Sequence, residues 1–393
     1  MITKKLNMWT SARRVGPHHR LSTGRPRPTP PSTVGPVLPS PTDRPQAVSD
    51  PTLGRELPAL EELLPHLMVV RLPMVVRFRG LTTRETALVR GPLGWAEFAP
   101  FTEYDDAEAS RWLAATLEAG WWGWPAPLRS TVPVNVTVPA VAAEEVPAVV
   151  ARVPGAGTAK IKVAERSVLD RDEAASTAND LARIAAVRRA MGPDAALRID
   201  ANGGWSVRQA ARALEQVAAT GERLDYCEQP CATAAELAEL RELLAARGVP
   251  TRIAADESIR RAADPLLVRA LGAADLIVVK AAPMGGAAAA AQIITATGLP
   301  TVVSSALESS VGLGAGVALA SSMPELAGAC GLGTAALFWH DVTSAPLVPE
   351  GGRIGLRRVE PDRAAELAAP DRTDWWARRI ERGLELLRAG QAG

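Results

Sequence analysis

The middle of this 393-residue chain repeats one pattern, a short apolar run that ends in a charged residue and is followed by a stretch rich in Ala and Leu. Three runs end in a carboxylate, at Asp200, Glu228 and Asp256, and a fourth ends at Lys280. The intervening stretches have helical period, so the pattern predicts repeating βα units and a parallel sheet. In a closed βα barrel the carboxyl ends of the strands open into one mouth, where these four residues would meet.

A further strand, residues 158–163, carries two lysines on one face. Its sequence alternates with a period of two, so Lys160 and Lys162 leave one side of the strand while Ile161 and Val163 leave the other. On an exposed edge strand, such lysines would only oppose aggregation. Together with three carboxylates in one barrel mouth, they indicate a divalent cation site with bases beside it.

Length and composition narrow the class of protein. A barrel takes about 250 residues, which leaves room for a second, smaller domain. Lys and Arg number 44 against 43 Asp and Glu, and this net charge of +1 gives no reason to expect a nucleic-acid partner. The sequence has no apolar run long enough to predict a membrane span. It has three cysteines and no recognisable export signal, which favours a reducing compartment. We therefore expect a cytoplasmic protein, a monomer or small homo-oligomer, that binds a small-molecule carboxylate.

The chain divides into three predicted parts. Residues 1–53 are rich in Pro, Arg, Ser and Thr without periodicity, which predicts a disordered extension. The sequence of residues 54–127 predicts a small α+β domain. A C-terminal helix, within about 366–393, is expected to complete this domain. Its expected strands are 67–72, 75–78, 86–90 and 94–98, followed by a helix at 105–119. Residues 128–365 predict the barrel, with strands at 132–137, 158–163, 197–200, 224–228, 252–256, 275–280, 301–305 and 335–338, and with helices at 172–190, 206–219, 233–246 and 264–271.

The carboxylates suit a magnesium site. Mg²⁺ prefers hard oxygen ligands and keeps some positions for water or substrate. Asp200, Glu228 and Asp256 could each be a helix cap or a salt-bridge partner, but three in successive βα units are harder to explain in that way. The sequence therefore predicts that they hold Mg²⁺, in a site that Mn²⁺ could also fill.

The lysines suit proton transfer beside that cation. The cation could stabilise the enediolate that forms when a substrate carboxylate loses its α-proton. Lys162 should have a lowered pKa because of the like charge of Lys160, so it could remove that proton. Lys280 could act as a second acid or base, or as a fixed cation, and Glu257 could hold Lys160 or Lys280 in place. The four histidines lie far from the strand ends in the sequence.

A segment between the first strands places Arg77, Arg79 and Arg84 around Gly80. These arginines could belong to a solvated turn. They could equally belong to a mobile loop that closes over a carboxylate-bearing ligand, because a guanidinium group suits bidentate carboxylate recognition.

Taken together, these residues resemble the enolase superfamily, in which a Lys or His base works beside Mg²⁺. More narrowly, the chain is similar to the o-succinylbenzoate synthase family of menaquinone biosynthesis, in its actinobacterial form. The matching segments are residues 78–85, 94–98, 158–165, 198–205, 228–233, 254–259 and 303–312.

The resemblance implies a modified (β/α)₇β barrel capped by the first domain. It implies dehydration of 2-succinyl-6-hydroxy-2,4-cyclohexadiene-1-carboxylate to 2-succinylbenzoate, with Lys162 removing the α-proton and then helping the hydroxyl depart on the same face. Lys280 would face the enediolate. Ser304, Ser305 and the following helix N-terminus would receive the succinyl end, and the remaining implied substrate contacts are Arg79, Arg84 and Asn202.

Two other functions fit the same residues. An N-acylamino acid racemase or dipeptide epimerase of the same superfamily needs a base on each face of the substrate, and Lys162 with Lys280 would supply both. A barrel that has lost catalysis would also keep the fold, but the complete set of lysines and carboxylates argues against it.

Overall fold

The computed structural model describes residues 51–78, 80–260, 265–362 and 366–392. The predicted disordered extension 1–53 falls outside this part of the chain except for its last three residues, which belong to a turn. Arg79, one of the predicted substrate contacts, also lies outside the described residues. Within the described residues, no helix has the length and apolar character that a membrane span requires.

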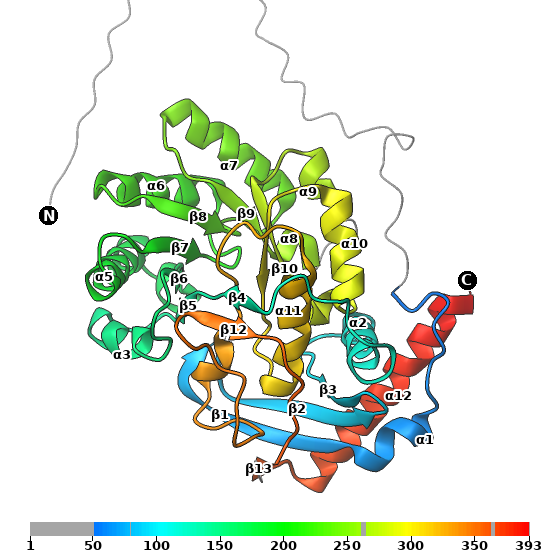
Figure 1. Cartoon of the computed structure of the whole chain (residues 1–393). Coiled ribbons are helices and arrows are strands. Elements are labelled where there is room, and N and C mark those ends of the chain that lie inside the picture. Colours follow the sequence, from blue (N-terminus) through cyan, green and yellow to red (C-terminus); the bar gives the residue numbers. More distant parts are fainter. Residues whose placement is uncertain (1–50, 79, 261–264, 363–365, 393) are drawn as a thin grey trace, which may run out of the picture. The chain divides into compact units, whose positions relative to one another are not determined.

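The first sheet is antiparallel, with strand order β13-β1-β2-β3 (Figure 1). Its strands are β1 (Met68–Phe78), β2 (Leu81–Gly91), β3 (Gly94–Phe98) and β13 (Glu366–Leu367). The predicted hairpin is confirmed, since Gly91 pairs with Gly94 across the turn. The two strands predicted at 67–72 and 75–78 are one strand, because β1 continues through a shift in its pairing register between Pro73 and Phe78.

Helices pack beside this sheet and complete the capping part of the chain. They are α1 (Leu60–Leu63), η2 (Leu64–His66), α2 (Asp106–Leu117), η3 (Glu118–Trp122) and α12 (Pro370–Ala392). Asp105 caps the start of helix α2, because its side chain accepts a hydrogen bond from the N–H of Glu108. The predicted C-terminal helix is present as α12, and it buries Trp376 with its ring edge-on to Phe98, 5.7 Å between centroids.

The second sheet is parallel and follows the chain in the order β5 to β11, of which Figure 1 labels β5 to β10. Its strands are β5 (Val136–Val138), β6 (Thr158–Lys162), β7 (Ala196–Asp200), β8 (Leu224–Glu228), β9 (Ile253–Ala255), β10 (Leu276–Lys280) and β11 (Thr301–Ser304). The predicted strand 132–137 is divided in two, because β4 (Thr131–Pro133) instead pairs antiparallel with β12 (Arg353–Gly355).

A short extended segment closes this sheet into a barrel. Gly331 forms a parallel bridge to Ser304 at the end of β11, and Cys330 forms one to Val134, just before β5. This segment supplies the eighth position around the barrel, as the predicted (β/α)₇β architecture requires. The strand predicted at 335–338 is wrong, because residues Thr334–Leu337 form a 3₁₀ helix, η6.

Helices connect the parallel strands and surround them. They are η4 (Ala143–Glu145), α3 (Val146–Val150), α4 (Arg166–Leu169), α5 (Glu173–Met191), α6 (Val207–Ala219), α7 (Ala234–Arg247), α8 (Glu257–Arg260), α9 (Leu267–Ala270), η5 (Ala282–Met284), α10 (Ala287–Thr297) and α11 (Ser310–Ser322). Side-chain caps at Asp172, Ser206 and Thr233 begin α5, α6 and α7. The helix predicted at 264–271 is shorter, since only α9 is helical within its described residues.

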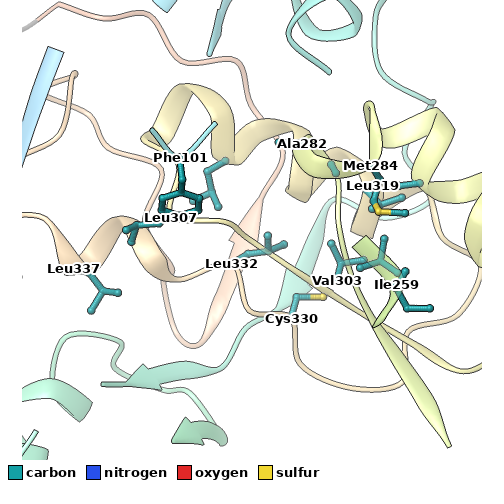
Figure 2. Packing of buried hydrophobic residues seen from close by; sticks show 14 of the residues in the cluster. Phe101, Ile259, Ala282, Met284, Val303, Leu307, Leu319, Cys330, Leu332 and Leu337 are labelled. Carbon is teal, nitrogen blue, oxygen red and sulfur yellow. The ribbon is translucent and has the colours of Figure 1, made fainter. Parts of the chain in front are cut away.

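One large apolar cluster joins the capping part to the barrel. Figure 2 shows a region of it in which Val303 of β11 and Leu332, next to the closing segment, belong to the same cluster as Phe101, which lies between β3 and α2. Because apolar side chains from both parts are buried together, the capping part is fixed over one end of the barrel.

A buried carboxylate reinforces this attachment. Glu118, in η3, accepts hydrogen bonds from the backbone N–H groups of Ala287 (2.6 Å) and Ala288 (2.8 Å) at the start of α10. These N–H groups have no partner inside the helix, so the carboxylate satisfies them. Burial raises the pKa of Glu118, while the two hydrogen bonds oppose that change.

Candidate active site

The barrel register brings the predicted site residues to one end of the sheet. Lys162 pairs with Asp200, and Asp200 pairs with Glu228, across three neighbouring strand ends. Asp256 follows β9 directly, and Lys280 pairs with Ser304 at the ends of β10 and β11. The carboxyl ends of parallel strands share one edge, which places these side chains at a common mouth.

A cavity at this mouth contains about 440 Å³ of space that is free of protein atoms, part of it open to solvent. The predicted residues that line it are Lys160, Lys162, Asn202, Glu257, Lys280, Ser304 and Ser305. Six further residues that were not predicted as site residues also line it: Phe78, Thr137, Arg260, Ala306, Leu307 and Thr334.

Each of the three carboxylates is buried against a lysine. Lys162 Nζ lies 2.5 Å from Asp200 Oδ2, and Lys160 Nζ lies 3.0 Å from Glu228 Oε1 and 3.5 Å from Asp200 Oδ2. Lys280 donates to Asp256. Carboxylates that are at most 1% exposed need such compensation, because an unpaired buried charge is costly.

Burial and these pairs move the carboxylate pKa values in different directions. Burial, and then the charge of Asp200, raise the pKa of Glu228 to about 7. Burial also favours the neutral form of Asp200, but the charges of Lys162 and Lys160 outweigh it and hold the pKa of Asp200 below its usual range. Burial likewise favours the neutral form of Asp256, but Lys280 and Arg260 together outweigh it and lower the pKa of Asp256 to about 2.

The two lysines of β6 differ from each other. Burial lowers the pKa of Lys162, and the charge of Lys160 adds to this effect while Asp200 opposes it. The predicted direction is therefore confirmed, but burial rather than the like charge is the largest cause. Burial disfavours the charged form of Lys160 too, yet Glu228 and Asp200 outweigh it and raise the pKa of Lys160, so this lysine stays protonated.

The side chains do not form a ready-made coordination sphere. Among the described residues, no three His, Cys, Asp or Glu side chains are arranged so that they could hold a metal ion. Asp200, Glu228 and Asp256 instead point their oxygens to the lysines. The predicted ligands are neighbours, as expected, but the structure has them in ion pairs.

Backbone strain concentrates just after the strand ends. The non-glycine residues with positive φ in the described chain are Ala164, Asn202, Gln229 and Leu307, which follow β6, β7, β8 and β11. The left-handed region is costly for residues other than glycine, less so for Asn. Strain that gathers in one place is typical of a functional site, where the surrounding contacts hold it.

Two buried contacts support the strand ends, and the sequence pattern did not reveal either. The amide of Gln229 accepts hydrogen bonds from the N–H groups of Asp256 and Ser258 and donates to Ser258 Oγ, which fixes the turn after β9. Arg183 of α5 donates to the carbonyl of Lys162 and to Asp180. The only signal for Gln229 is its place directly after Glu228, and Arg183 shows none beyond its spacing of three from Asp180.

The predicted helix N-terminus beside the serines is already occupied. Glu97 of β3 accepts hydrogen bonds from the N–H groups of Ser309 and Gly312, and Asp341 accepts from the N–H of Ser310. The prediction that the start of α11 receives a substrate carboxylate is therefore wrong. Burial raises the pKa of Glu97, with hydrogen bonds from Ser309 and Thr86 opposing.

The two serines keep their place on the cavity wall. Ser305 Oγ donates to the carbonyl of Gly331 (2.8 Å) and lies 2.7 Å from Thr334 Oγ1. Ser304 Oγ lies 3.4 Å from the same carbonyl. Their role in holding substrate stays a prediction.

The arginine-containing loop lines the cavity with an aromatic ring, and none of its arginines that the structure describes does so. Arg84 is buried, donates to the carbonyls of Leu307 and Ala99, and lies over the ring of Phe101 with its guanidinium carbon 4.2 Å from the centroid. It is not among the described residues that line the cavity, and its role as a substrate contact stays a prediction. Phe78 lines the cavity instead, with its ring 5.5 Å from Lys162 Nζ.

Glu257 has a different partner from the predicted one. Its carboxylate accepts hydrogen bonds from Arg260 Nη2 (2.5 Å) and Asn202 Nδ2 (3.3 Å), and neither Lys160 nor Lys280 is among its described contacts. Arg260 was missed because its contacts depend on the turn of α8, which the sequence pattern did not predict as a helix.

Comparison with known proteins places this chain in a family. A family model described as "Enolase N-terminal domain-like" matches residues 69–120, and one described as "Enolase C-terminal domain-like" matches residues 142–362. Curated proteins named o-succinylbenzoate synthase match almost over their whole length. The protein from Mycolicibacterium smegmatis is 52% identical over 327 residues, 82% of this chain and 97% of that protein. The protein from Mycobacterium tuberculosis is 50% identical over 334 residues, 84% of this chain and 97% of that protein.

Solved structures share the fold at low sequence identity. The L-Ala-D/L-Glu epimerase from Bacillus subtilis has a TM-score of 0.61 at 22% identity, and covers 77% of this chain and 98% of its own. A dipeptide epimerase from Enterococcus faecalis, complexed with Mg and the dipeptide L-Leu-L-Tyr, has a TM-score of 0.60 at 19% identity, and covers 75% of this chain and 97% of its own. By sequence and by fold, the chain belongs to the o-succinylbenzoate synthase family of the enolase superfamily, and it is a lyase.

Proposed function

We propose that this protein dehydrates 2-succinyl-6-hydroxy-2,4-cyclohexadiene-1-carboxylate to 2-succinylbenzoate, as a step of menaquinone biosynthesis, with Mg²⁺ as its cofactor. The observation that carries the proposal is the meeting of three lysines and three buried carboxylates at one barrel mouth, in a chain about half identical to proteins named for this product. All three cysteines are buried thiols without a disulfide, which supports a cytoplasmic location.

The donor set fits a hard divalent cation. Asp200, Glu228 and Asp256 offer only oxygen ligands, lie at adjacent strand ends and are almost fully buried. When bound, Mg²⁺, or Mn²⁺ in its place, would supply positive charge to the substrate carboxylate. The proposal requires these side chains to give up part of their lysine contacts.

Lys162 is the proposed base. Its amine lies at the cavity wall, within hydrogen-bond reach of Asp200 and Asn202, and its side chain is 13% exposed. The amine would take the α-proton, and the resulting ammonium would protonate the departing hydroxyl on the same face, so that water leaves and the ring becomes aromatic. Lys280 would face the negative charge that develops on the substrate. Lys160, which pairs with Glu228, would keep that carboxylate ionised.

Ser304 and Ser305 are the proposed contacts for the succinyl end. Both line the cavity, and hydroxyl groups can donate to a carboxylate. The capping part would contribute the Phe78 ring, an apolar surface against the substrate ring.

A second candidate function is racemisation of an N-acylamino acid or epimerisation of a dipeptide. Lys162 and Lys280 both line the cavity and come from strands separated by three others, so they could serve as bases on two faces of one α-carbon.

Turnover with a defined metal distinguishes these functions. The purified protein would be freed of metal with EDTA, mixed with the cyclohexadiene carboxylate, and followed by ultraviolet absorbance before and after Mg²⁺ is added. The proposal expects conversion only with Mg²⁺. If the protein instead converts none of this substrate and exchanges the α-proton of N-acylamino acids, the racemase is the function.

A further inference from the structure

A continuous chain of hydrogen bonds leads from the capping part to the amine of Lys162. Arg260 donates through Nη1 to Tyr104 Oη (3.2 Å) and through Nη2 to Glu257 Oε1 (2.5 Å). The same Glu257 oxygen accepts from Asn202 Nδ2 (3.3 Å). Lys162 Nζ then donates to Asn202 Oδ1 (2.7 Å). The Arg260–Glu257 link lies within α8, and the others connect α8 to Tyr104 of the capping part, to Asn202 after β7 and from there to Lys162 of β6.

We propose that Asn202 is a positioning residue that fixes the amine of Lys162, and that Glu257 sets the orientation of the Asn202 amide. This inference rests on the proposed function, in which Lys162 is the base. Asn202 is therefore assigned to the lysine rather than to the substrate.

The chemistry of the Asn202 amide supports this order of donors and acceptors in the series of hydrogen bonds. An Asn side chain has a donor at one end and an acceptor at the other, so donation to Glu257 turns Oδ1 toward Lys162. A carboxylate can only accept, and the guanidinium group of Arg260 keeps Glu257 in place with a charge-assisted bond. Without that carboxylate, the amide could turn and present its NH₂ group to the ammonium, which would push the lysine away.

Lys162 has one other described side-chain hydrogen-bond partner, Asp200. That carboxylate is shared with the proposed cation, whereas Lys162 is the described hydrogen-bond partner of Asn202 Oδ1. Asn202 is solvent-exposed at the mouth, so packing does not explain its place. The residue adopts a φ of 47°. Its own N–H donates a hydrogen bond to Asp200 Oδ1 (3.0 Å), which keeps it in this conformation.

The positive φ also decides which substitution tests the role. Glycine adopts this backbone region without strain, so Asn202→Gly removes the side chain and keeps the turn. Glu257→Gln keeps the shape of the carboxylate and weakens its hold on the Asn202 amide. Glu215→Gln, at a partly exposed ion pair with Arg247 on the outside of the barrel, is the matched control.

The experiment is a double-mutant cycle on turnover. Asn202→Gly should lower kcat by about 10- to 100-fold, because a base displaced by about 1 Å loses on that order. KM should stay within about threefold, because ground-state binding is not removed. With substrate deuterated at the α-carbon, the primary isotope effect on kcat should grow, since proton transfer becomes the slow step. Glu257→Gln should lower kcat less than Asn202→Gly does. The kcat of the double variant should lie within about twofold of that of Asn202→Gly.

Stabilisation by Mg²⁺ gives a readout that does not depend on turnover. The rise in melting temperature on adding Mg²⁺ should match wild type in Asn202→Gly, because the lysine and not the cation has lost its partner. An unchanged kcat, an unchanged isotope effect, a lost Mg²⁺ response, or fully additive losses in the double variant would each overturn the inference.

Failure of the proposed function is separable from failure of this inference. A wild type that converts the cyclohexadiene carboxylate, with Asn202→Gly equally fast, overturns the inference alone. A wild type that does not convert it overturns the proposed function, and the same cycle is then scored on deuterium uptake into an N-acylamino acid, where Lys162 is again the base. A wild type inactive in both assays overturns both.

Discussion

Glu308, which lies between β11 and α11, makes the stability of this protein depend on pH. The residue is 5% exposed, and its carboxylate accepts a hydrogen bond from the N–H of Ala306 (2.6 Å), next to the strained Leu307. Burial, and then the nearby charge of Glu97, raise the pKa of Glu308 from 4.5 to about 7. The folded protein therefore binds this proton more tightly than the unfolded chain does.

The sign and size of the effect follow from linkage. A raised folded pKa contributes stability that is fully present below 4.5 and is lost as the pH rises through about 7. Glu308→Gln is neutral at every pH and avoids that loss. At pH 8 the variant should therefore be more stable than wild type by up to about 3 kcal/mol, and at pH 5.5 by only about 1 kcal/mol.

Urea unfolding at the two pH values measures this difference. The free energy of unfolding of wild type, Glu308→Gln and the control Glu215→Gln would be compared at pH 8 and pH 5.5. The difference between Glu308→Gln and wild type should grow by about 2 kcal/mol from the lower to the higher pH, and the control should show no such growth. A difference that is the same at both pH values, or that grows toward low pH, would refute the reasoning.

Two further substitutions test the capping part. Glu118→Ala leaves two N–H groups at the start of α10 without their acceptor, and should lower the free energy of unfolding by about 2–3 kcal/mol in urea titrations. A loss below about 0.5 kcal/mol would mean that water replaces the carboxylate. Phe78→Ala should raise KM for the cyclohexadiene carboxylate about tenfold and change kcat less, because it removes about 1–2 kcal/mol of apolar contact. An unchanged KM would show that the ring does not touch the substrate.

The sequence was sufficient for the features that repeat locally. The parallel strands and their charged ends follow from a period of two and a helical spacing, so the meeting of Lys162, Asp200 and Glu228 could be predicted from register alone. Pairing register also explains why two strands were predicted where there is one. Strand β1 continues past Pro73 through an irregularity in its pairing that the sequence does not indicate. The run 335–338 was misassigned because four residues are too few to separate a strand from a helical turn.

The contacts that connect distant segments could not be predicted. Glu97 meets the start of α11 more than 200 residues later, and Arg84 meets Leu307 at a similar separation. Nothing in the local pattern distinguishes these buried partners from a substrate contact, since an arginine in a glycine-containing loop fits either. The cause of the Lys162 pKa shift was missed for the same reason, because burial is set by the whole fold.

The central claim is that Lys162 is the base of a Mg²⁺-dependent dehydration, and the most direct test is turnover by Lys162→Ala. The variant should convert no cyclohexadiene carboxylate above background, while its circular dichroism and its rise in melting temperature with Mg²⁺ match wild type. Turnover within about tenfold of wild type would contradict the account, because removing a general base costs about 10²- to 10⁴-fold.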